Sequence, residues 1–166
     1  MGVKYKTVKD NFPDMIKSLE TLSGKKVNVG CIKGNSQWLA AIHEYGCNIT
    51  VTPKMRAYLH HKGIHLKPTT TVIRIPERSF LRSGHDAHID EVMNKASKLL
   101  EQVISGKMSE DQLLKFVGLT LSTKIRTYAR ELSSPPNSSF TVEQKGSSNP
   151  LVDTGNMIGG ISFEVV

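Results

Sequence analysis

The chain has 166 residues, of which 38% are hydrophobic and 22% charged, as is typical of a single folded domain of ordinary size. It has no run of about 18 apolar residues, which argues against a membrane-spanning helix, and its polar, basic start predicts no secretory signal. The formal net charge is +7, and the basic excess lies in the first half. Residues 1–82 contain 14 Lys/Arg and 5 Asp/Glu, whereas residues 83–166 contain 8 Lys/Arg and 10 Asp/Glu.

The N-terminal third is expected to contain a helix, a strand and a second helix. Apolar residues at helical spacing predict a helix over residues 7–22, with a start near Asn11 because a proline lies in its first turn. The alternating stretch 26–32 predicts a half-buried strand. A short helix over about 36–45 should then end at Gly46, which tolerates the left-handed backbone that often ends helices.

Residues 47–76 are the least regular part of the chain and predict a long β-like excursion, either an extended loop or a hairpin. Residues 48–52 and 69–75 are rich in β-branched side chains and predict strand-like arms, with a possible helical turn over 53–61. Residues 47–76 contain no Asp or Glu, and the next acidic residue is Glu77. Loops this long inside a compact domain are usually functional. The basic residues of the excursion are Lys54, Arg56, Lys62, Lys67 and Arg74.

The second half predicts a long helix pair. Helical periodicity runs from Ser79 to about Gly106. Ser109 and Gln112 form a capping-box signature for a second helix that should run to about Leu132. Because only a short turn joins them, the two helices are expected to pack as an antiparallel pair.

The C-terminal region predicts a loop, a short helix and a last strand. Residues 133–149 are rich in Ser, Pro and Asn and predict an exposed loop. Asp153 or Thr154 should cap the short helix, and residues 161–166 predict a strand. We therefore expect a single α+β domain over the whole chain, with a small mixed or antiparallel sheet packed against the long helix pair.

The residues offer no catalytic, cofactor or metal site, and we expect no enzyme. Residues 30–34 lack the GK[ST] ending of a phosphate-binding loop. Cys31 and Cys47 lie in no nucleophile motif and are expected to be buried free thiols. The histidines lack the ligand spacing of a zinc site and are expected to be solvated or packing residues. They include His60, His61, His65, His85 and His88.

Binding to DNA is the main alternative that the residues themselves raise. The basic excess of residues 1–82, with Tyr58 among Lys, Arg and His, suits phosphate contacts and stacking. Aromatic residues make up only 6% of the chain, however, and no helix-turn-helix, RRM or zinc-finger signature occurs. A basic surface also docks onto acidic protein rings.

Three segments carry a family resemblance. Residues 38–46 (WLAAIHEYG) are similar to a helix ending of the form A-x-I-x-E-[FY]-G, and residues 75–82 (IPERSFLR) to I-P-x-R-[PS]-F-L-R. Residues 150–157 (PLVDTGNM), leading into 160–165 (GISFEV), are similar to P-L-x-D-T-G-x-[LM] and a last strand. In this order they resemble the tail-completion and virion-morphogenesis family of long-tailed double-stranded DNA bacteriophages. The resemblance covers about residues 27–166, with Ser79 where proline is commoner.

The resemblance implies a structural virion protein without catalysis, made in the host bacterial cytoplasm and placed in the neck at the head-proximal end of the tail. Such tail terminators commonly form closed rings, often of six copies. The implied partners are other copies of the chain, the major tail tube protein and head–tail connector or adaptor proteins, with phage DNA passing through the lumen and no membrane involved. The alternatives are a head–tail adaptor, a minor tail protein or a basic DNA-binding accessory protein.

A closed ring needs a heterologous interface, in which one patch meets a different patch on the next copy. We hypothesise that the excursion 47–76 reaches over an adjacent subunit or the tube, and that the strand 161–166 adds to a neighbouring sheet edge. Tyr45 is expected to anchor its helix on the sheet. Two arginines flanking the Phe80-Leu81 pair either reach a partner's carboxylates or are ordinary surface charges. The complete set of expected interface residues is Lys54, Arg56, Lys62, Lys67, Arg74, Arg78, Arg82, Ile161, Phe163 and Val165.

Overall fold

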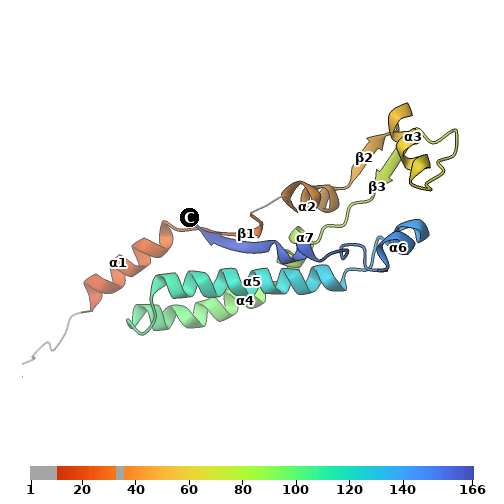
Figure 1. Cartoon of the computed structure of the whole chain (residues 1–166). Coiled ribbons are helices and arrows are strands. Elements are labelled where there is room, and N and C mark those ends of the chain that lie inside the picture. Colours follow the sequence, from red (N-terminus) through yellow and green to blue (C-terminus); the bar gives the residue numbers. More distant parts are fainter. Residues whose placement is uncertain (1–10, 33–35) are drawn as a thin grey trace, which may run out of the picture.

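The computed structural model describes residues 11–32 and 36–166. It has the expected α+β class, and Figure 1 shows an elongated molecule with α1 at one end and a two-stranded arm at the other. None of the described helices is long and apolar enough to cross a membrane. The elements in chain order are α1 (Phe12–Ser23), β1 (Val27–Cys31), α2 (Ser36–Tyr45), β2 (Cys47–Thr50), α3 (Pro53–His61), β3 (Val72–Ile75), α4 (Leu81–Ile104), α5 (Glu110–Glu131), α6 (Ser139–Lys145), α7 (Asn156–Gly159) and β4 (Ile161–Val165).

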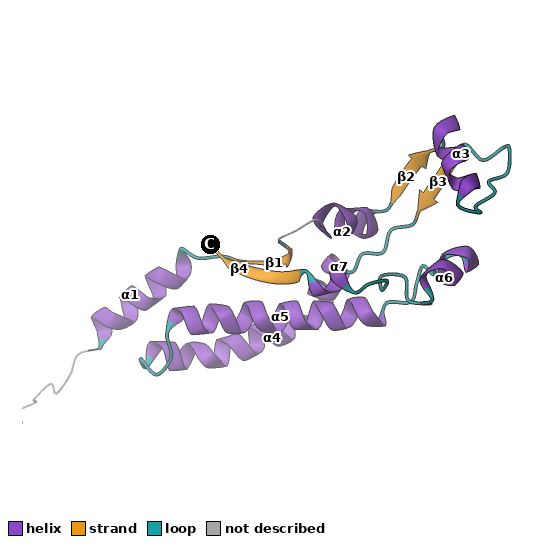
Figure 2. Ribbon diagram, in the orientation of Figure 1, coloured by secondary structure: helices purple, strands orange, loops and turns teal. Residues whose placement is uncertain are grey.

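The long helices α4 and α5 form the expected antiparallel pair (Figure 2). The predicted capping box is present at the start of α5, where Ser109 Oγ accepts from the backbone N–H of Gln112 at 3.3 Å and the Gln112 side chain accepts from that of Ser109 at 2.9 Å. The two helices bury small and branched side chains between them, including Val92 and Ile125.

A two-stranded antiparallel sheet, β1 with β4, packs on α5. Its register pairs Val27 with Val165 and Cys31 with Ile161. Gly118 makes the close approach possible, because a Cβ atom at this position would lie 2.2 Å from Cδ2 of Phe163. The terminal strand is therefore held between β1 and the backbone of α5.

The main hydrophobic core joins segments that are far apart in the sequence. Ala40 from α2, Phe80 from the start of α4 and Ile161 from β4 are all buried in one cluster. Leu151 and Ile158 from the C-terminal segment also belong to it. The short helix α7 and its preceding turn thus contribute to the core.

Two local predictions in the C-terminal region are wrong. Residues 133–149 include the helix α6, which Ser138 caps by accepting from the backbone N–H of Thr141 at 3.2 Å. The cap residue of α7 is Gly155, at φ +80°, with no side-chain cap from Asp153 or Thr154. Near the N-terminus, α1 starts beside Asn11 as expected, and residues 7–10 of the predicted helix lie outside the described residues.

Candidate functional site

The excursion is an ordered arm, which we define as residues 47–75. Its strands β2 and β3 pair in an antiparallel register from Cys47 with Ile75 to Thr50 with Val72. The predicted helical turn is the nine-residue helix α3 at the tip, capped by Thr52, whose Oγ1 accepts from the backbone N–H of Met55 at 3.2 Å. Figure 1 shows the arm projecting from the molecule beyond α2.

The arm has no hydrophobic core of its own, since none of residues 45–77 is buried. Isolated two-stranded hairpins are marginally stable in water, so other contacts must order the tip. Arg56 supplies them: its guanidinium donates to the carbonyl oxygens of Lys67 at 2.9 Å and Thr70 at 2.6 Å, and to that of Leu66 at 3.3 Å. Arg56 therefore ties the loop after α3 back onto the helix.

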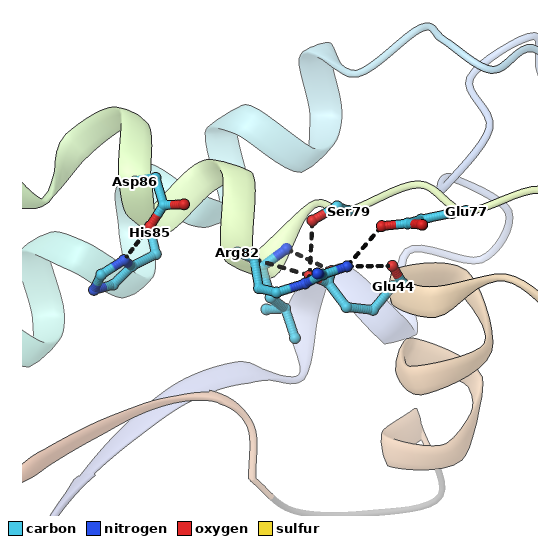
Figure 3. Close-up of polar contacts among 7 residues, drawn as sticks. Glu44, Glu77, Ser79, Arg82, His85 and Asp86 are labelled. Atoms are coloured by element: carbon cyan, nitrogen blue, oxygen red, sulfur yellow. Dashed lines mark hydrogen bonds and ion pairs between the residues drawn. The ribbon is translucent and has the colours of Figure 1, made fainter.

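The base of the arm is held by a polar cluster centred on Glu44, the last buried residue of α2. Its carboxylate accepts from Ser79 Oγ at 3.0 Å, from the backbone N–H groups of Leu81 at 2.8 Å and Arg82 at 3.0 Å, and from Arg82 Nε at 3.0 Å (Figure 3). The helix α4 has no cap from its own N-cap residue, Phe80. Glu44 thus caps α4 from a different helix, where a negative charge also complements the helix dipole.

These hydrogen bonds also decide the charge state of Glu44. Burial alone would raise the pKa of this carboxyl group, but the backbone N–H groups of Arg82 and Leu81 and the side chains of Arg82 and Ser79 outweigh burial and hold the pKa below its ordinary value. The carboxylate therefore stays ionised and fully engaged. In that state its oxygens hold the start of α4 against the end of α2.

Arg82 links the cluster to the start of the segment after the arm. Its Nη2 donates to Glu77 Oε1 at 2.7 Å and to the Glu44 carbonyl oxygen at 3.2 Å. The guanidinium lies over the ring of Tyr45, 4.8 Å from its centroid. Tyr45 is 65% exposed, so the expectation that it anchors α2 on the sheet is wrong, and it packs under Arg82 instead.

Arg78 must be removed from the expected partner interface. Its backbone N–H donates to the His43 carbonyl oxygen at 2.7 Å, and its guanidinium donates to the carbonyl oxygens of Pro135 at 2.8 Å and Pro136 at 3.2 Å and to Asn137 Oδ1 at 3.1 Å. The residue is buried, so a partner's carboxylate has no access to it. Its role is to fasten the loop after α5 to the base of the arm.

The surroundings of the neighbouring His43 disfavour its charged form. Burial, followed by the positive charges of Arg78 and Lys145, lowers the pKa of the imidazole. Arg78 Nη1 lies 3.5 Å from His43 Nδ1. A neutral ring beside a buried guanidinium avoids placing two like charges together.

We call the cluster of Glu44, Glu77, Arg78, Ser79 and Arg82 the junction. The segments 38–46 and 75–82 meet in it, and Gly46 allows their close approach: its φ is +71°, and a Cβ atom would lie 2.8 Å from the Glu77 nitrogen and 2.9 Å from the Ile75 oxygen. The third segment joins through the core, where its residues pack in the same cluster as Phe80 and Ala40. All three segments that carry the family resemblance therefore build one structural unit at the base of the arm.

The remaining expected interface residues divide into exposed and internal ones. Lys54, Lys62 and Lys67 are exposed on the arm, and Lys62 Nζ lies 5.9 Å from the ring centroid of Tyr58. Arg74 is also exposed, with its Nε donating to Asn48 Oδ1 at 3.3 Å. These four cations stay candidates for contact with a partner, whereas Arg56 is engaged within the arm.

The terminal strand is less available than expected. Ile161 has no exposed surface, and its carbonyl oxygen accepts two hydrogen bonds from the Arg126 guanidinium. Ile161 therefore cannot contact a partner, and the prediction that it is an interface residue is wrong. Phe163 and Val165 are half-buried, and β4 already pairs with β1, so any strand addition would have to use the other edge of β4.

An apolar groove of about 840 Å³ lies between β1 and α4. Its walls include Val29, Ile89 and Met93, and its polar rim contains His85 and Asp86, whose Nδ1 and Oδ1 atoms lie 2.9 Å apart (Figure 3). The polar residues of the lining, Arg82, His85, Asp86 and Ser97, all belong to α4.

The described histidines and cysteines are the other reactive side chains of interest. Among residues 11–32 and 36–166, no group of three or more His, Cys, Asp or Glu is placed to hold a metal ion. The rings of His60 and His65 pack edge to face with centroids 4.5 Å apart. Cys31 and Cys47 are free, but both are half-buried rather than buried. Burial, and then the charge of Glu44, raise the pKa of the Cys31 thiol, which disfavours the reactive thiolate.

Sequence reasoning missed the central role of Glu44. The residue precedes a helix-ending glycine, but its partners lie 35 to 38 positions later in the chain, and no local pattern marks such a long-range cap. Comparisons with protein-family models, curated proteins and solved structures found no match for the chain.

Proposed function

We propose that this chain is a structural subunit of a long-tailed bacteriophage particle, from the neck or tail-completion region, and that it forms a ring joining the tail tube to the head connector. The observation that carries the proposal is the convergence of the three resembling segments. They are separated by up to about a hundred residues in the sequence, yet they meet at the base of the arm. Their side chains serve to hold an element in place, as a structural role requires.

The shape of the chain also supports assembly into a ring. The arm projects from the molecule (Figure 1) and contains no buried residue, so it exposes most of its surface for contact beyond its own subunit. An arm on one copy that meets a different surface on the next is a heterologous interface, and such interfaces generate rings when the rotation closes. The junction would then set the angle at which the arm leaves the body.

Native mass and particle binding test this proposal. Light scattering behind a sizing column, over a range of concentration and salt, should give about six times the 18.4 kDa mass of one chain, and electron microscopy should show closed rings. Purified chain mixed with tail tubes of its own particle should cap one end of each tube. A head–tail adaptor would instead bind the connector and leave tube ends free. A chain that stays monomeric and binds neither tubes nor connectors contradicts the proposal.

A further inference from the structure

We propose that the tip of the arm binds the phosphate backbone of duplex DNA through Lys54, Lys62 and Lys67. This inference rests on the proposed function in one respect, because in the particle the arms would meet DNA only if they face the lumen of the proposed ring. The chemistry of the tip is independent of that context, and can be tested on the purified chain.

The three lysines carry charge that the chain does not neutralise. All three are exposed, and within the described residues none forms an ion pair or donates a side-chain hydrogen bond. No acidic residue occurs between Glu44 and Glu77, and both of these bind Arg82 at the junction. The tip is therefore a surface of uncompensated positive charge, which attracts a polyanion.

The tip is less suited to a protein partner than to DNA, so contact with a neighbouring copy would fall to the rest of the arm. Protein interfaces are enriched in aromatic residues and Arg at an apolar centre and depleted in Lys, whereas the large exposed hydrophobic residues of the arm are only Tyr58 and Val72. Arginine, which matches carboxylates with two parallel hydrogen bonds, is turned inward at Arg56. Lysine binds phosphate as a point charge, and interfaces with DNA are polar and strongly positive.

The tip presents these charges on a fixed frame. Lys54 lies in the first turn of α3 and Lys62 directly follows its last residue. Their Cα positions, eight residues apart, are separated by about 12 Å along the helix axis. One DNA strand carries a phosphate every 3.4 Å along the helix axis, so this separation spans three to four phosphates. Arg56 holds the carbonyl of Lys67 to α3, which fixes the backbone of the third lysine against the helix that carries the first.

The test compares two triple variants with the same change in charge. K54E/K62E/K67E alters the tip, and K98E/K107E/K115E alters three exposed lysines of α4, the turn after it and α5. Each variant lowers the net charge by six, from +7 to +1. Binding to a fluorescently labelled 20-base-pair duplex is measured by anisotropy between 50 and 200 mM salt, with circular dichroism melts to show that both variants fold.

We expect the tip variant to reduce the slope of log affinity against log salt by about 2.7 for each arm that contacts the duplex, since each lost phosphate contact removes about 0.9. Over a fourfold range of salt, the wild-type chain should then lose about 40-fold more affinity than the tip variant. The control variant should keep most of the wild-type slope.

Three results would overturn the inference. Equal losses in the two variants would show that net charge, and not the tip, attracts DNA. An unchanged slope in the tip variant would exclude the tip as a DNA contact. A tip variant that binds DNA normally but no longer forms rings or caps tubes would identify an acidic protein as the partner, and would leave the proposed function standing. Conversely, a monomeric chain with the expected slope change would contradict the ring while supporting the DNA contact.

Discussion

Replacing Glu44 by Ala should strongly destabilise the protein, because this one carboxylate caps α4 and accepts four hydrogen bonds. Loss of a helix cap costs about 1 kcal/mol, and leaving buried donors without a partner adds about 1–3 kcal/mol. The Arg82 side chain is half-exposed, so water can replace the lost carboxylate. The lost ion pair therefore contributes little to the destabilisation. The sum is about 3 kcal/mol, equivalent to a fall of about 6–12 °C in Tm for a chain of this size.

The assay is urea unfolding followed by circular dichroism, with Glu77→Gln as the matched control. Glu77 binds the same arginine at 2.7 Å, but its side chain is 56% exposed, so its loss should change the free energy of unfolding by less than about 0.5 kcal/mol. Glu44→Gln keeps one acceptor oxygen without the charge and should fall between the two, at about 1–2 kcal/mol. Equal effects of Glu44→Ala and Glu77→Gln would refute the reasoning that burial and capping make Glu44 the centre of the junction.

The pH dependence of Glu44 gives an independent check. Its folded-state pKa lies below its ordinary value, so the unfolded state binds the proton more readily. The stabilising contribution is therefore complete above the unfolded value of about 4.3 and is lost as the pH falls through the lower folded value. Glu44→Gln should flatten the decline of unfolding free energy below about pH 4.5; an unchanged decline would count against the assignment.

Three further changes test other contacts. Gly46→Ala should destabilise by about 2 kcal/mol or more, because it places a left-handed side chain against the backbone. Gly63→Ala, also left-handed but in open space, should cost only about 1 kcal/mol. Equal shifts of the two urea midpoints would contradict this. Gly118→Ala should cost about 1–3 kcal/mol through overlap with Phe163, and Phe163→Leu in the same chain should recover part of the loss in a thermal melt. The folded-state pKa of His43 is lowered, so stability should decline as the pH falls below the unfolded value of about 6.5, and His43→Gln should reduce that decline between pH 7 and 5 in urea titrations.

Local signals account for what could be predicted of the fold. The capping box at Ser109 and the apolar periodicity of α5 depend on neighbours within four residues, and the structure confirms both predictions. The helix α6 was missed although Ser138 and Gly146 carry an ordinary start and stop signal, because the surrounding Ser, Pro and Asn outweighed them. The sequence therefore contained the signal for α6, but the composition of the surrounding loop was given more weight.

The candidate site could be predicted only in part for a different reason. The sequence favours either a partner contact or a surface charge for Arg78, but its acceptors are carbonyl oxygens and an amide 57 to 59 residues away. Backbone carbonyls carry no residue-type signature. A sequence pattern therefore cannot identify a buried arginine whose hydrogen-bond acceptors are backbone carbonyls. The exposed lysines of the arm can be recognised, because they lie in a basic stretch that contains no acidic residue.

The way Arg56 fastens the tip of the arm has a thermodynamic consequence for assembly. Its three hydrogen bonds to carbonyl oxygens order the loop during folding of the subunit, so little chain entropy remains to be lost when the arm meets its target. Segments that fold on binding show large negative heat-capacity changes from the apolar surface that they bury. Association through this arm should instead show a small heat-capacity change, set by the charged contact surface alone, and Arg56→Met should make it larger by coupling binding to ordering of the loop.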